Sequence, residues 1–154
     1  MTSKPPLRVV AGNGHRPAKP QWSLRILIAD DDRDTVNTLA AVMRDEGHDV
    51  KVALRGDEVL EVERLLRPDV LIVDINMPGM SGYAIARELR EQRGVATPLL
   101  IAISGVWTRA SERLLGHAVG FDHYLLKPCD PAEIVAITNA YAQRGAPPPR
   151  TPEF

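Results

Sequence analysis

The stretch from Asp69 to Gly82, DVLIVDINMPGMSG, constrains the fold of this chain more than any other. It begins with an apolar, β-branched run, Val70–Val73, which is typical of a strand buried on both faces of a parallel sheet. The run ends on a carboxylate, Asp74, and a segment rich in Pro and Gly follows, which predicts a loop. Asp74 could simply cap the next helix, but Ser81 is better placed for that role. Because open α/β sheets bind ligands at the carboxyl ends of their strands, Asp74 is a candidate functional residue.

Four similar units of a strand followed by a helix surround this one. Apolar runs predict the other strands at 24–29, 49–54, 98–103 and 123–126. Amphipathic spacing predicts helices around 36–43, 56–66, 85–89 and 110–118, and a last helix from Pro131 with Asp130 as its cap. Asp32 or Asp34 can cap the first helix. Five such units in succession predict an α/β sandwich with a parallel sheet and right-handed crossovers.

The overall composition is that of an ordinary soluble domain. The chain has 154 residues, of which 44% are hydrophobic and 25% charged, and these values suit one domain with a proper core. A net charge of −1 gives no global case for binding nucleic acid or a membrane. The single cysteine excludes an internal disulfide framework, and no apolar run approaches membrane-spanning length. We therefore expect a soluble, cytoplasmic protein.

The two ends of the chain differ from this pattern. Residues 1–22 contain four prolines and several basic residues but no acidic ones, which predicts a disordered leader. A basic arm that touches nucleic acid or a partner is the alternative for this segment. Residues 144–154 are rich in proline and are also expected to be disordered. The folded domain is therefore expected at residues 23–143.

Polar side chains follow four of the predicted strands. Asp30 and Asp31 end the first strand, Asp74 the third, Ser104 the fourth and Lys127 the fifth. In a parallel sheet these ends lie at one edge, so the side chains are expected to converge. Clustered carboxylates offer only oxygen ligands, and such ligands favour a hard cation such as Mg²⁺. A lysine and a hydroxyl opposite the cation can bind phosphoryl oxygens. One carboxylate would then be a nucleophile that forms an aspartyl phosphate. Periodicity does not decide which two of Asp30, Asp31 and Asp32 form the acidic pair. Met77 and Met80, in the loop after Asp74, are expected to cover this acidic pocket.

Over about Leu24 to Tyr141, the chain resembles the receiver domains of two-component response regulators through ILIADDD, VLIVDINMPGMSG, LIAISG and FDHYLLKP. This resemblance implies a flavodoxin-like, doubly wound α/β fold, with a five-stranded parallel sheet in the order 2-1-3-4-5 and helices on both faces. It also implies that Asp74 accepts a phosphoryl group from the phosphohistidine of a histidine kinase. The function implied is a signalling switch activated by phosphorylation, which catalyses only its own phosphorylation and dephosphorylation.

The resemblance also implies roles for single residues. Asp31, Asp74 and the backbone carbonyl of Asn76 would bind Mg²⁺ directly, and Asp30 would act mainly through metal-bound water. Lys127 would pair with the phosphoryl oxygens, and a cis Lys127–Pro128 bond would direct its side chain into the pocket. Ser104 would donate a hydrogen bond to the phosphoryl group, and Tyr124 would turn inward as the aromatic switch. Ser104 and Gly105 depart from the commoner residues of the family, but neither change removes a catalytic group. Trp107 lies three residues after Ser104 and is expected to report the change.

The expected partners are a histidine kinase or histidine phosphotransfer protein and a downstream protein target, with a phosphorylation-dependent homodimer as one form of output. Direct binding to membrane or nucleic acid is not expected. A phosphorylation-independent interaction module and a receiver excised from a hybrid histidine kinase are the alternatives. A Mg²⁺-dependent phosphohydrolase is a weaker hypothesis, because Asn76 stands where that class usually needs a second acid.

Overall fold

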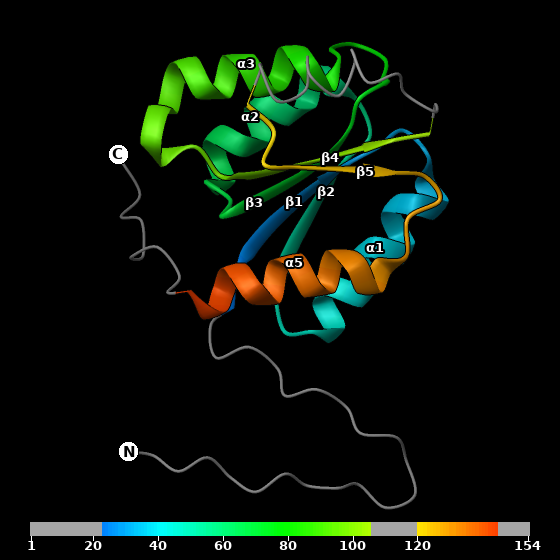
Figure 1. The fold of residues 1–154 in the computed structure, drawn as a ribbon. Coiled ribbons are helices and arrows are strands. Elements are labelled where there is room, and N and C mark those ends of the chain that lie inside the picture. Colours follow the sequence, from blue (N-terminus) through cyan, green and yellow to red (C-terminus); the bar gives the residue numbers. More distant parts are fainter. Residues whose placement is uncertain (1–22, 106–119, 145–154) are drawn as a thin grey trace, which may run out of the picture.

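The computed structural model describes residues 23–105 and 120–144. These residues form three layers, with a parallel sheet between two layers of helices (Figure 1). The predicted leader, tail and fourth helix, together with Trp107 and His117, lie outside the described residues. No helix in the described ranges has both the length and the apolar composition that a membrane span requires.

The sheet has five strands in the order β2-β1-β3-β4-β5, and all neighbouring strands are parallel. The strands are β1 (Arg25–Ala29), β2 (Asp49–Ala53), β3 (Val70–Asp74), β4 (Leu99–Ser104) and β5 (His123–Leu126). In the register of the central strands, Ala29 lies beside Val73, and Val73 beside Ala102. The predicted strand order is therefore confirmed, and the polar residues at the strand ends lie at one edge of the sheet.

The helices in the described residues are α1 (Arg33–Asp45), α2 (Gly56–Leu66), α3 (Gly82–Arg93), the short 3₁₀ helix η1 (Gly94–Ala96) and α5 (Pro131–Gln143). Short polar side chains cap α1, α3 and α5, whereas the side chain of Arg55 makes no capping hydrogen bond to α2. The carboxylate of Asp32 accepts a hydrogen bond from the backbone N–H of Asp34, so Asp32 is the cap of α1. Ser81 and Asp130 cap α3 and α5 in the same way. Each cap satisfies a backbone donor that the helix leaves unpaired.

The core has two parts, one on each face of the sheet, because successive side chains of a strand point to opposite faces. Ile26 and Ile28 of β1 pack with α1 and α5, whereas Leu27 of the same strand packs with α2 and α3. Figure 1 shows these two helix pairs on opposite sides of the sheet. Met77 was expected to cover the acidic pocket from the loop after β3. That expectation is wrong, since Met77 is buried in the α2–α3 part of the core.

A buried ion pair between α2 and α3 was not expected from the sequence. Val59, Val62 and Leu66 of α2 have the spacing of one helix face, but only Val59 is fully buried. Glu63, which is 1% exposed, lies on that face instead and accepts two hydrogen bonds from the guanidinium of Arg93, at 2.8 and 3.1 Å. A paired geometry of this kind is what makes a buried carboxylate tolerable.

Three side chains, of which His48 and Asp69 are buried and Asp122 is exposed, accept hydrogen bonds from backbone N–H groups at the amino edge of the sheet. His48 Nδ1 accepts from Leu24 at 3.1 Å, Asp69 from Arg25 at 2.9 Å, and Asp122 from Leu100 at 2.8 Å. Such bonds satisfy donors at the strand starts that the sheet does not pair.

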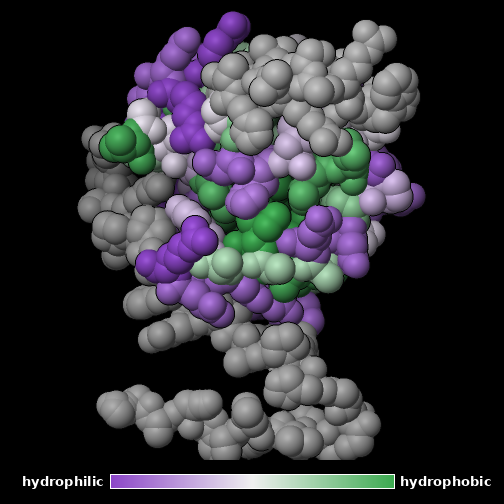
Figure 2. All heavy atoms as spheres, viewed as in Figure 1, coloured by the Kyte–Doolittle hydropathy of each residue, from purple (hydrophilic) through white to green (hydrophobic). Residues whose placement is uncertain are grey.

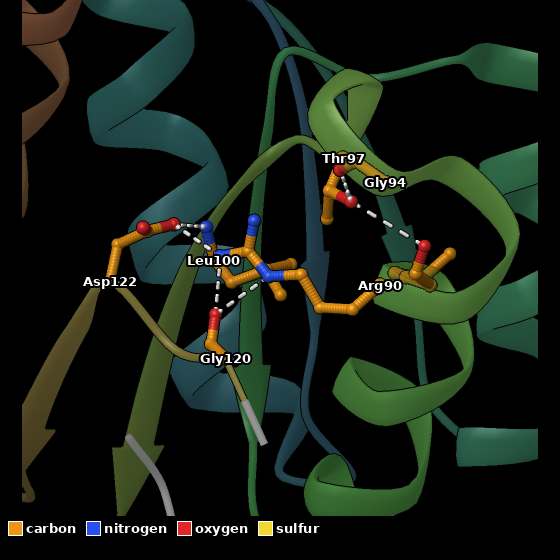
Figure 3. A network of polar contacts seen from close by, with 7 residues as sticks. Arg90, Gly94, Thr97, Leu100, Gly120 and Asp122 are labelled. Atoms are coloured by element: carbon orange, nitrogen blue, oxygen red, sulfur yellow. Dashed lines mark hydrogen bonds and ion pairs between the residues drawn. The ribbon is translucent and has the colours of Figure 1, made fainter. Parts of the chain in front are cut away.

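The last of these acceptors belongs to a larger polar network (Figure 3). Arg90 of α3 donates to the carbonyl of Gly120 and, at 3.1 Å, to the carboxylate of Asp122. Gly120 has a φ of +104°, and a Cβ there would meet Arg90 Nε at 2.6 Å. Arg90 therefore joins α3 to the chain that enters β5.

Candidate functional site

Three carboxylates gather at the carboxyl edge of the sheet. Asp30 and Asp31 follow β1 directly, and Asp74 is the last residue of β3. One oxygen from each lies within 4.8 Å of the others. Asp30 and Asp74 are buried, while Asp31 is exposed. The predicted convergence of these residues is therefore confirmed.

Lys127 follows β5 and faces the carboxylates. Its Nζ lies 2.6 Å from Asp30 Oδ2 and 3.5 Å from Asp74 Oδ2. The Lys127–Pro128 peptide bond is cis, as expected. Burial opposes the charge of the lysine, but Asp30 and Asp74 outweigh it and hold the pKa of Lys127 above its usual value. Lys127 therefore stays protonated beside the cluster.

The surroundings of Asp74 disfavour its charged form. Burial is the main cause and repulsion by Asp30 the next, and together they raise the pKa of Asp74 to about 6. Lys127 and the backbone N–H of Asn76, which donates to Asp74 Oδ1 at 3.2 Å, act in the opposite direction. One lysine thus compensates only part of the negative charge in the cluster, and a further cation would relieve the rest.

The loop after Asp74 is closed by backbone hydrogen bonds at both ends. The N–H of Ile75 donates to Ile103 at 3.0 Å, and the N–H of Gly82 donates to Ile75 at 2.9 Å. Asn76 lies between these anchors and is exposed. Its carbonyl belongs to the same turn as the Asp74 carboxylate, so backbone and side-chain oxygens lie at one edge of the sheet.

Ser104 ends β4 and is buried. Its backbone carbonyl accepts a hydrogen bond from the N–H of Lys127 at 2.7 Å, which ties the ends of β4 and β5 together. Gly105 leaves limited room, since a Cβ there would lie 3.4 Å from the Lys127 side chain. Ser104 is thus placed beside Lys127, as the strand ends predicted.

Tyr124 lies on β5, beside Ala102 of β4. Its ring packs against the α2–α3 part of the core. Its hydroxyl is buried and, within the described part of the chain, has no hydrogen-bond partner. A buried hydroxyl without a partner costs free energy, so this position favours a rearrangement that would pair it.

The donors of the cluster suit Mg²⁺. They are carboxylate oxygens, and hard cations prefer oxygen ligands. The excess of negative charge around Asp74 also favours binding of a cation. Among the described residues, the cluster contains no sulfur or imidazole ligand, since Met77 is in the core and His48 lies at the opposite edge of the sheet.

A hollow of about 580 Å³ adjoins the cluster between the start of α1 and the turn after β5. Its lining residues are Asp32, Asp34, Thr35, Thr38, Leu39, Gly105, Lys127, Pro128, Cys129 and Pro131. Sequence reasoning did not find this hollow, because it forms between segments about 90 residues apart in the chain. It provides access to Lys127 from the α1 side.

Comparison with known proteins places the fold and the cluster in a family. Residues 26–139 match the response regulator receiver domain family. The chain is 38% identical over 120 residues to the DNA-binding response regulator MtrA of Mycobacterium tuberculosis, covering 78% of this chain and 51% of MtrA. It is also 38% identical over 109 residues to the aerobic respiration control protein ArcA of Escherichia coli, covering 71% of this chain and 44% of ArcA. The chain thus spans about half the length of these curated relatives.

Solved structures agree with this result. The chemotaxis response regulator CheY4 of Vibrio cholerae superposes with a TM-score of 0.71 at 26% identity, over 77% of this chain and 98% of that one. The receiver domain of Francisella response regulator 1452 gives 0.72 at 29% identity, over 79% and 98%. Family, relatives and architecture agree over the region that contains the acidic cluster. The chain therefore belongs to the response regulator receiver domain family.

Proposed function

We propose that this domain is a phosphorylation-driven switch in which Asp74 accepts the phosphoryl group of a phosphohistidine. The observation that carries the proposal is the convergence of Asp30, Asp31 and Asp74 within 4.8 Å, with Lys127 facing them. The donor is a histidine kinase or a histidine phosphotransfer protein. The reaction is limited to the domain's own phosphorylation and dephosphorylation.

In this proposal the carboxylate oxygen of Asp74 attacks phosphorus while the phosphorus–nitrogen bond of the phosphohistidine breaks. The bonding electrons stay on the imidazole nitrogen, which then takes a proton. Asp31, Asp74 and the carbonyl of Asn76 would hold Mg²⁺, and Asp30 would act through metal-bound water. When bound, Mg²⁺ neutralises negative charge on the phosphoryl oxygens. Lys127 moves from Asp30 toward the phosphoryl group, a short shift since its Nζ is already 3.5 Å from Asp74.

The phosphate is read out through β4 and β5. The hydroxyl of Ser104 donates a hydrogen bond to a phosphoryl oxygen, and Tyr124 then turns inward and pairs its buried hydroxyl. The surface that changes is the one over β5 and α5. Figure 2 shows apolar side chains at the centre of this face. A hollow of about 270 Å³ lies there, between Leu99 and His123 of the sheet and Ile137 and Tyr141 of α5.

Two different surfaces then serve two partners. The hollow beside Lys127 and Cys129 receives the phosphohistidine donor, because Lys127, which pairs with Asp30 and Asp74, is one of its lining residues. The face over β5 and α5 binds the downstream protein or, as a second form of output, another copy of the domain. MtrA is a DNA-binding response regulator, and this chain matches only part of it. For the receiver domain itself we propose a protein target and no direct contact with nucleic acid or membrane. The domain spans residues 23–143 in a cytoplasmic protein.

Incubation with acetyl phosphate and Mg²⁺, followed by intact mass measurement, tests the function. We expect one phosphoryl adduct on the native chain and none on Asp74→Asn. Asp49→Asn, which changes an exposed carboxylate at the start of β2, at the opposite edge of the sheet, is the matched control and should be phosphorylated normally. Absence of any adduct would favour an interaction module that works without phosphate. Multiple turnover of unrelated phosphate esters would favour a phosphohydrolase.

A further inference from the structure

The loop after Asp74 is in backbone contact with the first turn of α2. The N–H of Gly56 donates a hydrogen bond to the carbonyl of Pro78 at 2.9 Å. A Cβ on Gly56 would lie 1.9 Å from the carbonyl oxygen of Met80 and 2.6 Å from its nitrogen. Both clashing atoms belong to the backbone, so no rotation of a side chain could relieve the overlap.

Glycine is needed at position 56 for space and not for its backbone conformation. Gly56 is the first residue of α2 and is buried, and its φ angle is not positive. On the loop side of the contact, Gly79 also has no room for a side chain. A Cβ on Gly79 would lie 2.5 Å from the carboxylate of Asp57, and Gly79 has a φ of +93°. Glycines on both segments thus let α2 and the loop approach more closely than side chains would allow.

The contact lies close to the proposed metal site along the chain. Pro78 and Met80 are two and four residues after Asn76, whose carbonyl is a proposed Mg²⁺ ligand. At the end of the loop nearer to Asp74, Ile75 fixes the chain through its backbone hydrogen bonds with Ile103 and Gly82. The tip of the loop is held on its other side by Gly56. Displacement of the tip would therefore move the Asn76 carbonyl relative to the Asp74 carboxylate.

We propose that Gly56 is a positioning residue for the metal site, which acts through the 76–80 backbone and touches neither metal nor phosphoryl group. The inference rests on the proposed function, because it takes the Asn76 carbonyl as a ligand. Residues that orient metal ligands from outside the first layer commonly change metal affinity by about 10-fold to 100-fold when replaced. Gly56 performs this task with an N–H group and the absence of a side chain.

Titration of the folded protein with Mg²⁺ alone, followed by calorimetry, tests the inference. We expect Gly56→Ala to raise the dissociation constant about 10-fold or more. The matched control is Val59→Ala, one turn further along α2, which removes buried methyl groups but keeps Gly56 and its hydrogen bond to Pro78. Val59→Ala should lower the thermal midpoint yet keep the native affinity. Equal Mg²⁺ affinity in Gly56→Ala and the native chain would overturn the inference. Absence of Mg²⁺ binding to the native chain would instead overturn the proposed function.

A second measurement on the native chain covers the case in which Gly56→Ala does not fold. Mg²⁺ and the Gly56–Pro78 hydrogen bond should stabilise each other, because coupling between two sites is reciprocal. Amide hydrogen exchange at Gly56 should therefore slow on adding Mg²⁺ relative to exchange at Arg67, the residue that caps the other end of α2. A ratio of the two exchange rates that Mg²⁺ leaves unchanged would contradict the inference.

Discussion

Lys127 pairs more closely with Asp30 than with Asp74, at 2.6 Å against 3.5 Å. Asp30 is 1% exposed, so without the lysine its carboxylate would be a buried charge with no neighbouring cation. The lysine thus has two tasks, since it stabilises the resting fold through Asp30 and lies within reach of the proposed phosphoacceptor.

Replacement of Lys127 by Gln should therefore destabilise the metal-free protein. Removal of one partner from a buried ion pair typically costs 3–5 kcal/mol, and partial exposure of Lys127 reduces our expectation to about 2–3 kcal/mol. Urea unfolding in the presence of a chelator measures the loss. Lys51→Gln, at an exposed position of β2, is the control and should change stability by less than about 0.5 kcal/mol. Equal stability of the two variants would show that water already compensates Asp30.

Asp31→Asn should have the opposite effect on the metal-free protein. Asp31 contributes to the raised pKa of Asp74, which means that the two carboxylates repel each other. Loss of this charge should raise the free energy of unfolding, by at most about 1 kcal/mol because Asp31 is exposed. The same change should weaken Mg²⁺ binding. Asp34→Asn should not stabilise, since that carboxylate lies in the first turn of α1. A less stable Asp31→Asn would mean that hydrogen bonds hold the cluster.

His48 should make the domain sensitive to acid. Burial lowers the pKa of His48 below its ordinary value of 6.5, although Glu46, Asn139 and Asp69 act in the opposite direction. Nδ1 accepts a hydrogen bond from Leu24, which requires the neutral ring. The unfolded chain therefore binds a proton more readily than the native one. The contribution of His48 to stability is complete above pH 6.5 and is lost as the pH falls through the unfolded value toward the native one.

The measurement compares the native chain with His48→Asn between pH 7.5 and 5, in steps of about half a unit. Asp74, with its pKa raised to about 6, has the opposite sign, because its folded form gains stability as the pH falls. This contribution is common to both proteins and cancels in their difference. The difference should shrink on acidification with a slope of at most about 1.4 kcal/mol per pH unit. A difference that does not depend on pH would mean that His48 titrates alike in both states.

The Glu63–Arg93 pair should matter mainly when it is broken on one side. Arg93→Met leaves the carboxylate of Glu63 buried without its partner, and we expect a loss of about 3 kcal/mol or more. Combining it with Glu63→Leu should recover most of that loss, since two apolar side chains can fill the same space. Thermal or urea unfolding of both single variants and the double variant gives the coupling energy. Additive effects would show that each residue acts alone.

The features that the sequence predicted well depend on local signals. The ends of β3 and β4 can be predicted from the sequence, because an apolar run stops at Asp74 or Ser104 and a turn follows. Parallel pairing of the strands then brings those ends together. The caps Asp32, Ser81 and Asp130 are similarly local. The Glu63–Arg93 and Arg90–Gly120 contacts each join residues 30 positions apart, and no periodicity indicates them. Met77 was misplaced because a loop position says nothing about the direction of its side chain.

The hydrogen bonds that His48, Asp69 and Asp122 accept at the amino edge have a practical consequence for genetic work on such a domain. They lie at the opposite end of the strands from the cluster of Asp30, Asp31 and Asp74, and they fix where β1 and β4 begin. Substitutions at this edge would leave every proposed phosphorylation residue unchanged and still abolish signalling, because the cell would clear the unfolded chain. A screen that scores only output would count them with Asp74 variants. Immunoblots of protein level would separate the two classes.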